Sequence, residues 1–234
     1  FGSPGIFIPG LIRLFRRRDR TRFFKDNEEV NEMIWGMVID LKLCIGCQAC
    51  SLACKTEYGL PRGMYWTKTL IDEVGIYPNV TRVYLPQLCN HCDEAPCEKT
   101  CPTGASYTDE ATGVVLVDYT KCMGCRACYV ACPYQNRYYL KRGALRGYYP
   151  EKGLTPFEAQ SYPHFTEGTV TKCVGCIERV MGGLDPACVT NCPTYARKFG
   201  DLSDPDSEIR QLIRSRNATQ PMAEKGTEPK VYYI

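Results

Sequence analysis

Short alternating or continuous apolar segments recur along this chain, and each precedes a group of cysteines. Segments of this length and pattern are typical of short β-strands bounded by turns. Four strands are predicted, at Met37–Leu41, Val80–Leu85, Val114–Asp118 and Thr169–Thr171. Each is followed by a cysteine-containing loop and then by a short segment that we expect to be helical. The pattern therefore predicts an internal repeat of strand, cysteine loop and short helix.

Glycine and proline separate these units and mark the connections. The stretch from Arg137 to Pro163 is rich in tyrosine, glycine and proline, and we expect a long surface insertion there. Residues 209–213 are predicted to form one helix, and residues 221–234 an extended tail. No run of 18 or more apolar residues occurs, so no segment of this sequence is expected to span a bilayer.

The first 35 residues form a basic segment with interspersed apolar side chains. Its arginines are Arg13, Arg16, Arg17, Arg18, Arg20 and Arg22. The simpler interpretation is a solvated helix face or a tail lying on a partner subunit; the alternative is contact with an anionic membrane surface. The sequence begins with Phe1, so we expect the true start to be missing or removed. Residues 19–29 are polar where a twin-arginine signal needs an apolar region, so that signal is not indicated.

Cysteine is the outlier in the composition, at 16 of 234 residues. A chain of this length can bury its own core and needs no framework of disulfides. The net charge of +3 carries no broad basic excess that would indicate nucleic-acid binding. All sixteen cysteines fall into four groups of four. The groups are Cys44, Cys47, Cys50 and Cys54; Cys89, Cys92, Cys97 and Cys101; Cys122, Cys125, Cys128 and Cys132; and Cys173, Cys176, Cys188 and Cys192.

The spacing within these groups favours cubane iron–sulfur clusters. A C-x2-C-x2-C loop can wrap three corners of one cubane, while the fourth cysteine points away and ligates a neighbouring cluster. Proline follows three of the four closing cysteines, at Pro102, Pro133 and Pro193, and fixes the direction of the chain. A zinc site would need pairs of C-x2-C instead, and adjacent C-x2-C cysteines form disulfides only with strain. Metal and sulfide analysis would distinguish a zinc-stabilised interaction module from an iron–sulfur protein.

The residues around the cysteines carry a family resemblance. The segments are CIGCQACSLACKTEYGLP, LCNHCDEAPCEKTCPTGASY, KCMGCRACYVACPYQNRYY and KCVGCIERVMGGLDPACVTNCPTYARKFGDLSDPDSE. They resemble the four-cluster subunit of molybdopterin oxidoreductases of the dimethyl-sulfoxide-reductase type. Polysulfide and thiosulfate reductase subunits are the most similar branch, through EVGIYPNV and KGTEPKVYYI. The resemblance covers residues 36–234 and leaves out the basic arm.

The resemblance implies an α+β fold of two bacterial ferredoxin-like 2[4Fe–4S] modules, one nested within the other. The implied organisation is a basic arm at 1–35, an outer module at 36–79 plus 165–204, an inner module at 80–136, an insertion at 137–164 and a C-terminal helix and tail at 205–234.

The same resemblance implies that the first cysteine run pairs with the fourth, and the second with the third. The outer ligand sets would be Cys44, Cys47, Cys50 and Cys192, and Cys54, Cys173, Cys176 and Cys188. The inner sets would be Cys89, Cys92, Cys97 and Cys132, and Cys101, Cys122, Cys125 and Cys128. The spacing by itself also permits the first run to pair with the second.

Some members of this family replace one cysteine with tryptophan and hold a [3Fe–4S] cluster. Both tryptophans, Trp35 and Trp66, lie outside the runs, so we expect four [4Fe–4S] clusters. Lys55 departs from the pattern, because proline follows the other closing cysteines. We expect it to leave ligation unchanged and to loosen the start of its helix.

Several polar residues lie within or beside the runs. Cationic side chains there would favour the reduced clusters, because nearby charge tunes reduction potentials. The candidates are His91, Lys121, Arg126 and Lys172. For each one, the simpler interpretation is a surface charge that faces solvent. His164 is expected at the surface or an interface, and the pairs Tyr138–Tyr139 and Tyr148–Tyr149 in packing or interfaces.

No nucleophile–base constellation, phosphate-binding glycine loop or paired-carboxylate site is evident, so we expect no substrate chemistry in this chain. The resemblance implies single-electron relay between a molybdenum or tungsten bis-molybdopterin catalytic subunit and an integral membrane subunit that reacts with quinol. Related complexes often lie on the periplasmic side of the membrane, which we expect here, while the sequence leaves the cytoplasmic side open. We expect the basic arm and the tyrosine-rich insertion to be docking surfaces. A free-standing polyferredoxin is the alternative, although the arm, insertion and tail favour a fixed subunit. The terminal substrate would be chosen by the catalytic partner.

Overall fold

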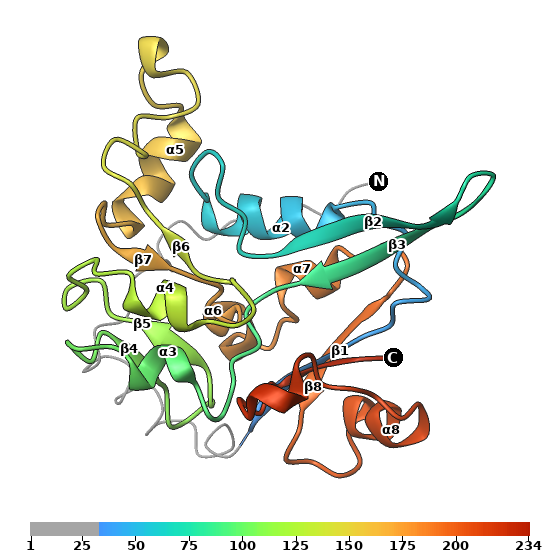
Figure 1. Cartoon of the computed structure of the whole chain (residues 1–234). Coiled ribbons are helices and arrows are strands. Elements are labelled where there is room, and N and C mark those ends of the chain that lie inside the picture. The colour runs from blue at the N-terminus through green and yellow to red at the C-terminus, as the bar shows by residue number, and fades with distance from the viewer. Residues whose placement is uncertain (1–32) are drawn as a thin grey trace.

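A computed structural model describes residues 33–234 (Figure 1), so nearly all of the predicted basic arm lies outside the described residues. No helix in this part of the chain is both long enough and apolar enough to cross a membrane. The strands are β1 (Trp35–Ile39), β2 (Lys68–Ile76), β3 (Asn79–Gln87), β4 (Ser106–Thr108), β5 (Val115–Val117), β6 (Tyr138–Tyr139), β7 (Val170–Thr171), β8 (Arg197–Asp201) and β9 (Val231–Tyr233). The α-helices are α2 (Ala49–Tyr58), α3 (Pro96–Lys99), α4 (Ala127–Ala131), α5 (Pro156–Ser161), α6 (Ile177–Met181), α7 (Ala187–Thr190) and α8 (Glu208–Ser215).

The largest sheet has three strands in the order β8–β1–β9, and all five residues of β1 are buried. Strand β8 pairs with β1 in antiparallel fashion, from Trp35 opposite Asp201 to Ile39 opposite Arg197. Strand β1 begins two residues before the predicted Met37 and ends at Ile39. It ends there because the Asp40 carboxylate accepts the N–H groups of Lys42 and Leu43 and turns the chain.

Residues 221–234, predicted as an extended tail, do include an extended strand, but this strand belongs to the main sheet. Strand β9 pairs in parallel with β1, and Val231 is buried in the main core. A short 3₁₀ helix, Ala223–Lys225, precedes it. The tail sequence is too short and irregular to indicate a strand by itself. Residues 231–233 form a strand because they pair with β1. By contrast, the helix predicted at 209–213 is confirmed as α8, with Ile209 fully buried and Ser207 capping its first turn.

Strands β2 and β3 form a long antiparallel hairpin that projects from the body of the molecule (Figure 1). The register runs from Lys68 opposite Gln87 to Ile76 opposite Asn79. The predicted strand Val80–Leu85 lies within β3, whereas β2 was not predicted. Its alternating side chains are mostly solvent-exposed, so burial does not impose the usual apolar pattern on them.

The remaining sheets are two-stranded, with β4 against β5 and β6 against β7. The pairing of β6 with β7 corrects the predicted surface insertion, because Arg137 and Leu140 are fully buried beside these strands. Pairing with β7, which shortly precedes Cys173, draws this part of the insertion into the core. Side chains further along, including Tyr149 and Phe157, are exposed as expected of a surface segment.

Short helices follow the cysteine loops, as the repeat predicts. Helix α2 of the first run packs against α7 of the fourth run, and α3 of the second run packs against α4 of the third. These two contacts bring together segments that are distant in the sequence. The buried residues of the cores include many cysteines, so the loops and the core are continuous.

Candidate iron–sulfur site

Each of the four runs opens with the same backbone turn. The residue two places after the first cysteine has a positive φ in all four runs. These residues are Gly46 (φ 70°), His91 (φ 44°), Gly124 (φ 73°) and Gly175 (φ 65°). Glycine adopts this conformation without strain, whereas a residue with a side chain rarely does. The turn folds the C-x2-C segment back on itself, and in the fourth run the Gly175 N–H donates to the Cys173 sulfur at 3.4 Å.

The closing cysteines of three runs share a second turn. The third residue after Cys101, Cys132 and Cys192 again has a positive φ. In the second run this turn lets the Ser106 N–H donate to the Cys101 sulfur at 3.4 Å. These are the three runs in which proline follows the closing cysteine. N–H groups aimed at sulfur are the donors that tune iron–sulfur centres.

Lys55, which replaces proline after the first closing cysteine, has a different role from the one expected. Cys54 and Lys55 lie in the middle of α2, so Lys55 does not loosen the start of the helix. Its ammonium donates to the carbonyls of Leu60, Pro61 and Met64, beyond the helix end. A cation at this position stabilises the C-terminus of a helix. Lys55 therefore secures the segment that carries Cys54.

Thiols of the first and fourth runs lie together. Burial raises the pKa of Cys54 well above its ordinary range, and Cys173, Cys188 and Cys176 raise it further. Burial also raises the pKa of Cys44, whose thiol neighbours include Cys50 and Cys192. The structure thus places thiols of the first run beside thiols of the fourth run.

Thiols of the second and third runs also meet. A pocket with about 340 Å³ of empty space is lined by four cysteines from these runs, together with Arg137 and other residues. The four are Cys89, Cys92, Cys97 and Cys132. Cys128 has Cys97 and Cys122 as its thiol neighbours. Cys47 and Cys125 are exposed. The assignment of these two cysteines, and of Cys101, to a cluster rests on their positions in the sequence of the runs.

The two groups of runs approach each other at one junction. A second pocket with about 450 Å³ of empty space is lined by Cys173, Cys176 and Cys188 on one side and Cys89 on the other. Cys89 is also among the thiols that raise the pKa of Cys173, after burial itself. This junction places a cysteine of the second run beside cysteines of the fourth run.

The chemistry of this donor set fits iron–sulfur clusters. All sixteen cysteines are free thiols, and no three or more Cys, His, Asp or Glu side chains between residues 33 and 234 converge on a single-ion site. A zinc site requires four ligands within about 2.3 Å of one ion, and no such convergence occurs within residues 33–234. Two buried side-chain nitrogens near the thiols, His91 Nε2 and Arg137 Nη1, have no hydrogen-bond partner among the described residues. Both are donors suited to cluster sulfides.

Comparison with known proteins agrees with this geometry. The 4Fe-4S dicluster domain family matches residues 80–147 and 148–202, and a 4Fe-4S binding domain family matches residues 41–59. The arsenate respiratory reductase iron–sulfur subunit ArrB of Shewanella sp. (strain ANA-3) is 39% identical, over 85% of this chain and 95% of its own length. A selenate reductase subunit of Mesobacillus selenatarsenatis is 38% identical, over 96% and 78% respectively. A provisionally named dimethyl sulfoxide reductase iron–sulfur subunit of Halobacterium salinarum is 44% identical, over 86% and 78%.

This chain belongs to the iron–sulfur subunits of the dimethyl-sulfoxide-reductase family. It contains ferredoxin-like [4Fe–4S] dicluster domains, and it transfers electrons rather than catalysing a substrate reaction. The resemblance seen in the cysteine segments is thereby confirmed. A free-standing carrier is not favoured, because the relatives are named as subunits of reductases.

The four polar residues singled out beside the runs of this iron–sulfur subunit separate into two kinds. Lys121 and Arg126 are exposed, as the simpler interpretation predicted, and Arg126 lies over the Tyr139 ring at 4.0 Å. His91 and Lys172 are buried, with 8% and 1% of their surface exposed, so the surface interpretation is wrong for them. Strand β5 covers both of them, which the local sequence does not indicate.

Two functional candidates were missed by sequence reasoning. Arg137 and Arg197 are buried among the cysteines, and each is the fifth residue after a closing cysteine. The shared pattern C-P-x3-R, at Cys132 and at Cys192, could have identified both. His164, expected at the surface, is partly buried, and burial lowers its pKa.

We expect cluster loading of the apoprotein to increase between about pH 6 and pH 8. The apoprotein is expected to be largely unfolded, so its thiols have an ordinary pKa of about 8.5 and become deprotonated increasingly as the pH rises through this range. Each thiol must lose its proton to bind iron, and a lower pH therefore opposes loading. Iron and acid-labile sulfide per chain, measured after anaerobic reconstitution at several pH values, would test this. Loading that is equal or greater at the acidic end would contradict it.

Proposed function

We propose that this subunit relays single electrons through four [4Fe–4S] clusters held by its sixteen cysteines. The proposed outer sets are Cys44, Cys47, Cys50 and Cys192, and Cys54, Cys173, Cys176 and Cys188. The proposed inner sets are Cys89, Cys92, Cys97 and Cys132, and Cys101, Cys122, Cys125 and Cys128. A bound [4Fe–4S] cluster supplies one-electron redox chemistry. The protein contributes the ligands, the buried surroundings and the spacing between clusters.

The observation that carries this proposal is the meeting of distant cysteine runs. Cys54 has three thiols of the fourth run as neighbours, and the pocket at Cys89 includes Cys132 of the third run. Both meetings exchange a closing cysteine between runs, as dicluster ferredoxins do. They favour first-with-fourth pairing over first-with-second pairing.

We extend this pairing to the organisation of the chain. An inner module at 80–136 would be inserted into an outer module formed by 36–79 plus 165–204. The packing of α2 on α7 and of α3 on α4 supports this nested arrangement. The insertion would include residues 137–164, and residues 205–234 would add α8 and β9 to the outer module.

The partners would be a molybdopterin catalytic subunit, with molybdenum or tungsten, and an integral membrane subunit that reacts with quinone. The names of the relatives support a catalytic partner, because they include respiratory arsenate reductase and selenate reductase. Electrons would pass along the cluster row between the two partners. We propose the periplasmic side of the membrane for the complex. The basic arm lies outside the described residues and, with the exposed end of the insertion, is a candidate docking surface.

Anaerobic purification of the native complex tests the function. We expect a large molybdenum- or tungsten-containing subunit to co-purify, and about sixteen iron atoms per chain of this protein. Low-temperature EPR of the stepwise-reduced sample should resolve four [4Fe–4S] signals. An isolated chain that purifies alone with its full iron content would favour the free-standing carrier. A sample that contains zinc in place of iron would overturn the proposal.

The β2–β3 hairpin gives a further reason to expect a fixed partner. Its far end exposes Val74, Ile76 and Tyr77, of which the last two are 85% and 89% exposed. Val74 and Ile76 lie on the same face, since they are two residues apart in one strand. Large exposed apolar groups that gather in one place typically mark a protein interface. The sequence did not indicate this candidate surface because β2 was not predicted.

Replacing both Val74 and Ile76 with glutamate is expected to weaken assembly with the partner subunit that covers the hairpin about tenfold or more, while leaving the clusters intact. Two buried charges at an apolar interface cannot be solvated, whereas in the free chain both positions already face solvent. The recovery of the partner subunit with tagged protein, at equal iron content, measures the effect. Leu184→Glu serves as a matched control, because Leu184 is an exposed apolar residue between α6 and α7. Equal recovery with both variants would contradict the prediction.

A further inference from the structure

Three cationic side chains are buried deep in the described part of this protein without an acidic partner there. Arg137 and Lys172 are each 1% exposed, and Arg197 is 2% exposed. Within residues 33–234, no carboxylate oxygen lies within 4.0 Å of any of the three. An unpaired buried charge is strongly destabilising unless an opposite charge lies close to it.

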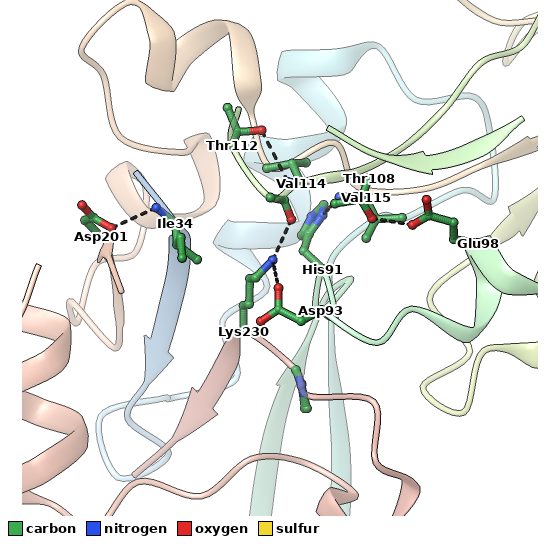
Figure 2. A network of polar contacts seen from close by, with 12 residues as sticks. Ile34, His91, Asp93, Glu98, Thr108, Thr112, Val114, Val115, Asp201 and Lys230 are labelled. Atoms are coloured by element: carbon green, nitrogen blue, oxygen red, sulfur yellow. Dashed lines mark hydrogen bonds and ion pairs between the residues drawn. The ribbon is translucent and has the colours of Figure 1, made fainter. Parts of the chain in front are cut away.

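Lys230 shows the contrast. It is also buried, but its ammonium pairs with the Asp93 carboxylate at 2.5 Å and donates to the Gly113 carbonyl at 2.8 Å (Figure 2). An ion pair with the exposed Asp93 carboxylate therefore accounts for Lys230. The other three cations need a different source of negative charge, and each lies beside cysteine sulfurs that would bind a cluster as thiolates.

Arg197 lies between the two proposed outer ligand sets. The fully buried Arg197 side chain has the Cys188 sulfur as a hydrogen-bonding neighbour and the Cys50 sulfur as a further neighbour. These two cysteines belong to different outer sets. The guanidinium is held by a hydrogen bond from Nη2 to the Thr67 hydroxyl at 3.0 Å. This bond fixes the charge in the space between the two groups of thiols.

Arg137 has the corresponding position between the two inner sets. Burial opposes its charge, while Cys97, Cys128 and Cys89 raise its pKa above the ordinary value. Cys97 and Cys89 line the same pocket as Arg137, and Cys128 belongs to the other inner set. Nη2 donates to the Ser106 hydroxyl at 2.6 Å, and Nη1 has no hydrogen-bond partner within residues 33–234.

The two arginines reach these positions through one local geometry. Each follows a closing cysteine, a proline and a left-handed third residue, Gln135 or Tyr195, before the chain turns inward at the fifth residue. Ser106 is the fifth residue of the corresponding segment after Cys101, and it receives the hydrogen bond from Arg137. The internal repeat therefore places one buried arginine, Arg197, in the proposed outer module and the other, Arg137, at the residue that directly follows the proposed inner module.

Lys172 lies at the junction between the two proposed modules. Its ammonium donates to the Cys173 carbonyl at 2.6 Å and to the Val115 carbonyl. It lies 3.5 Å from Nδ1 of His91, which is between Cys89 and Cys92 in the chain. The same nitrogen accepts the Val115 N–H at 3.2 Å, so the His91 ring is fixed against β5 (Figure 2). Lys172 thus adjoins an outer ligand on one side and an inner ligand loop on the other.

We propose that Arg197, Lys172 and Arg137 occupy the three gaps in the row of four clusters, and that each raises the reduction potential of the two clusters that it separates. The inference rests on the ligand sets of the proposed function. As an electron moves along the row, one cluster loses it and the next gains it. A fixed positive charge in the gap stabilises the extra negative charge on either side. It also offsets the repulsion between neighbouring reduced clusters.

The chain offers a matched pair of variants for the test. Lys172 and Lys121 both stand in a Thr-Lys-Cys segment, immediately before the first cysteine of a run. The Lys121 side chain is half exposed and 3.9 Å from the Asp118 carboxylate, whereas Lys172 is buried without an acid in the described contacts. Lys172→Met and Lys121→Met therefore remove the same charge from equivalent sequence positions in different surroundings.

EPR-monitored redox titration of the intact complex reports the potential of each cluster. In Lys172→Met, two of the four clusters should show about a tenfold lower reduced-to-oxidised ratio at a given potential, which is about 59 mV for a one-electron couple. Lys172→Arg should restore both. Lys121→Met should change no cluster by more than about twofold, because solvent and salt screen an exposed charge.

The order of the row gives a second measurement. Arg197→Gln and Arg137→Gln should each lower two clusters, with no cluster common to both variants, and Lys172→Met should share one cluster with each. If Lys172→Met does not assemble, the two arginine variants decide the question, because each should lower the potentials of two clusters that the other variant leaves unchanged. Unchanged potentials, an equal shift of all four clusters, or an equal effect of Lys121→Met would overturn the inference. A wild-type complex with fewer than four clusters would instead overturn the proposed ligand sets.

Discussion

Replacing Cys188 with serine is expected to remove one cluster from the protein and to reduce the yield of assembled complex about tenfold or more. Cys188 is buried in α7, and its thiol lies beside those of Cys54 and Cys176. A serine hydroxyl ionises far less readily than a thiol and is a poor ligand for iron. The defect should spread beyond one site, because α7 packs against α2, which carries ligands of both proposed outer clusters.

The measurement for this variant is iron per chain, with the EPR spectrum of whatever protein accumulates. We expect about four fewer iron atoms per chain than in the wild type. Val189→Ser is a suitable control, because it introduces the same hydroxyl at the next position in α7 without removing a ligand. A Cys188→Ser protein with full iron content, normal yield and normal electron transfer would rule out the proposed ligand map.

Removal of iron is expected to unfold most of the described chain. Cysteines make up three of the seven buried residues in the core around the inner runs, namely Cys92, Cys97 and Cys128. The sheets there have two strands each, and the helices α3 and α4 have four and five residues. Helices and hairpins of this size are not stable in isolation. Without clusters, little besides the loops would hold these elements together.

Anaerobic chelation under reducing conditions, followed by circular dichroism and proteolysis, tests the prediction. We expect loss of the near-ultraviolet signal and rapid cleavage within the inner runs. The sheet β8–β1–β9 has a more ordinary apolar core, including Met37, Ile39 and Val231, and should be the last part to become susceptible. An apoprotein that keeps its protection throughout the chain would show that side-chain packing alone specifies the fold.

The cysteine runs could be predicted from the sequence because their spacing follows from the chemistry of the ligand. The strands before three of the runs were also predictable, since β1, β5 and β7 are largely buried and lie in short apolar segments. The helix α8 was predicted because it buries one side, through Ile209, and is exposed on the other. Local pattern and final burial agree in each of these elements.

The missed elements depend on contacts between distant segments. Strand β2 is largely exposed, so no buried face imposes a pattern on it. Strands β6 and β9 have two and three residues, and each is defined by its partner rather than by its own sequence. The buried state of Lys172 also cannot be read locally, because Lys121 stands in the same sequence context and is exposed. What differs is the strand β5, whose Val115 carbonyl binds Lys172.

The position of β1 in its sheet has a consequence for biosynthesis. Both of its neighbours, β8 and β9, come late in the chain, whereas β4 and β5 are close together in sequence. A nascent chain can therefore pair β4 with β5 while β1 is still unpaired, because β8 and β9 have not yet left the ribosome. During that interval the apolar residues of β1 and the first cysteines are uncovered. A chaperone that shields this early strand, and delays any encounter with oxygen, would be most useful before translation finishes.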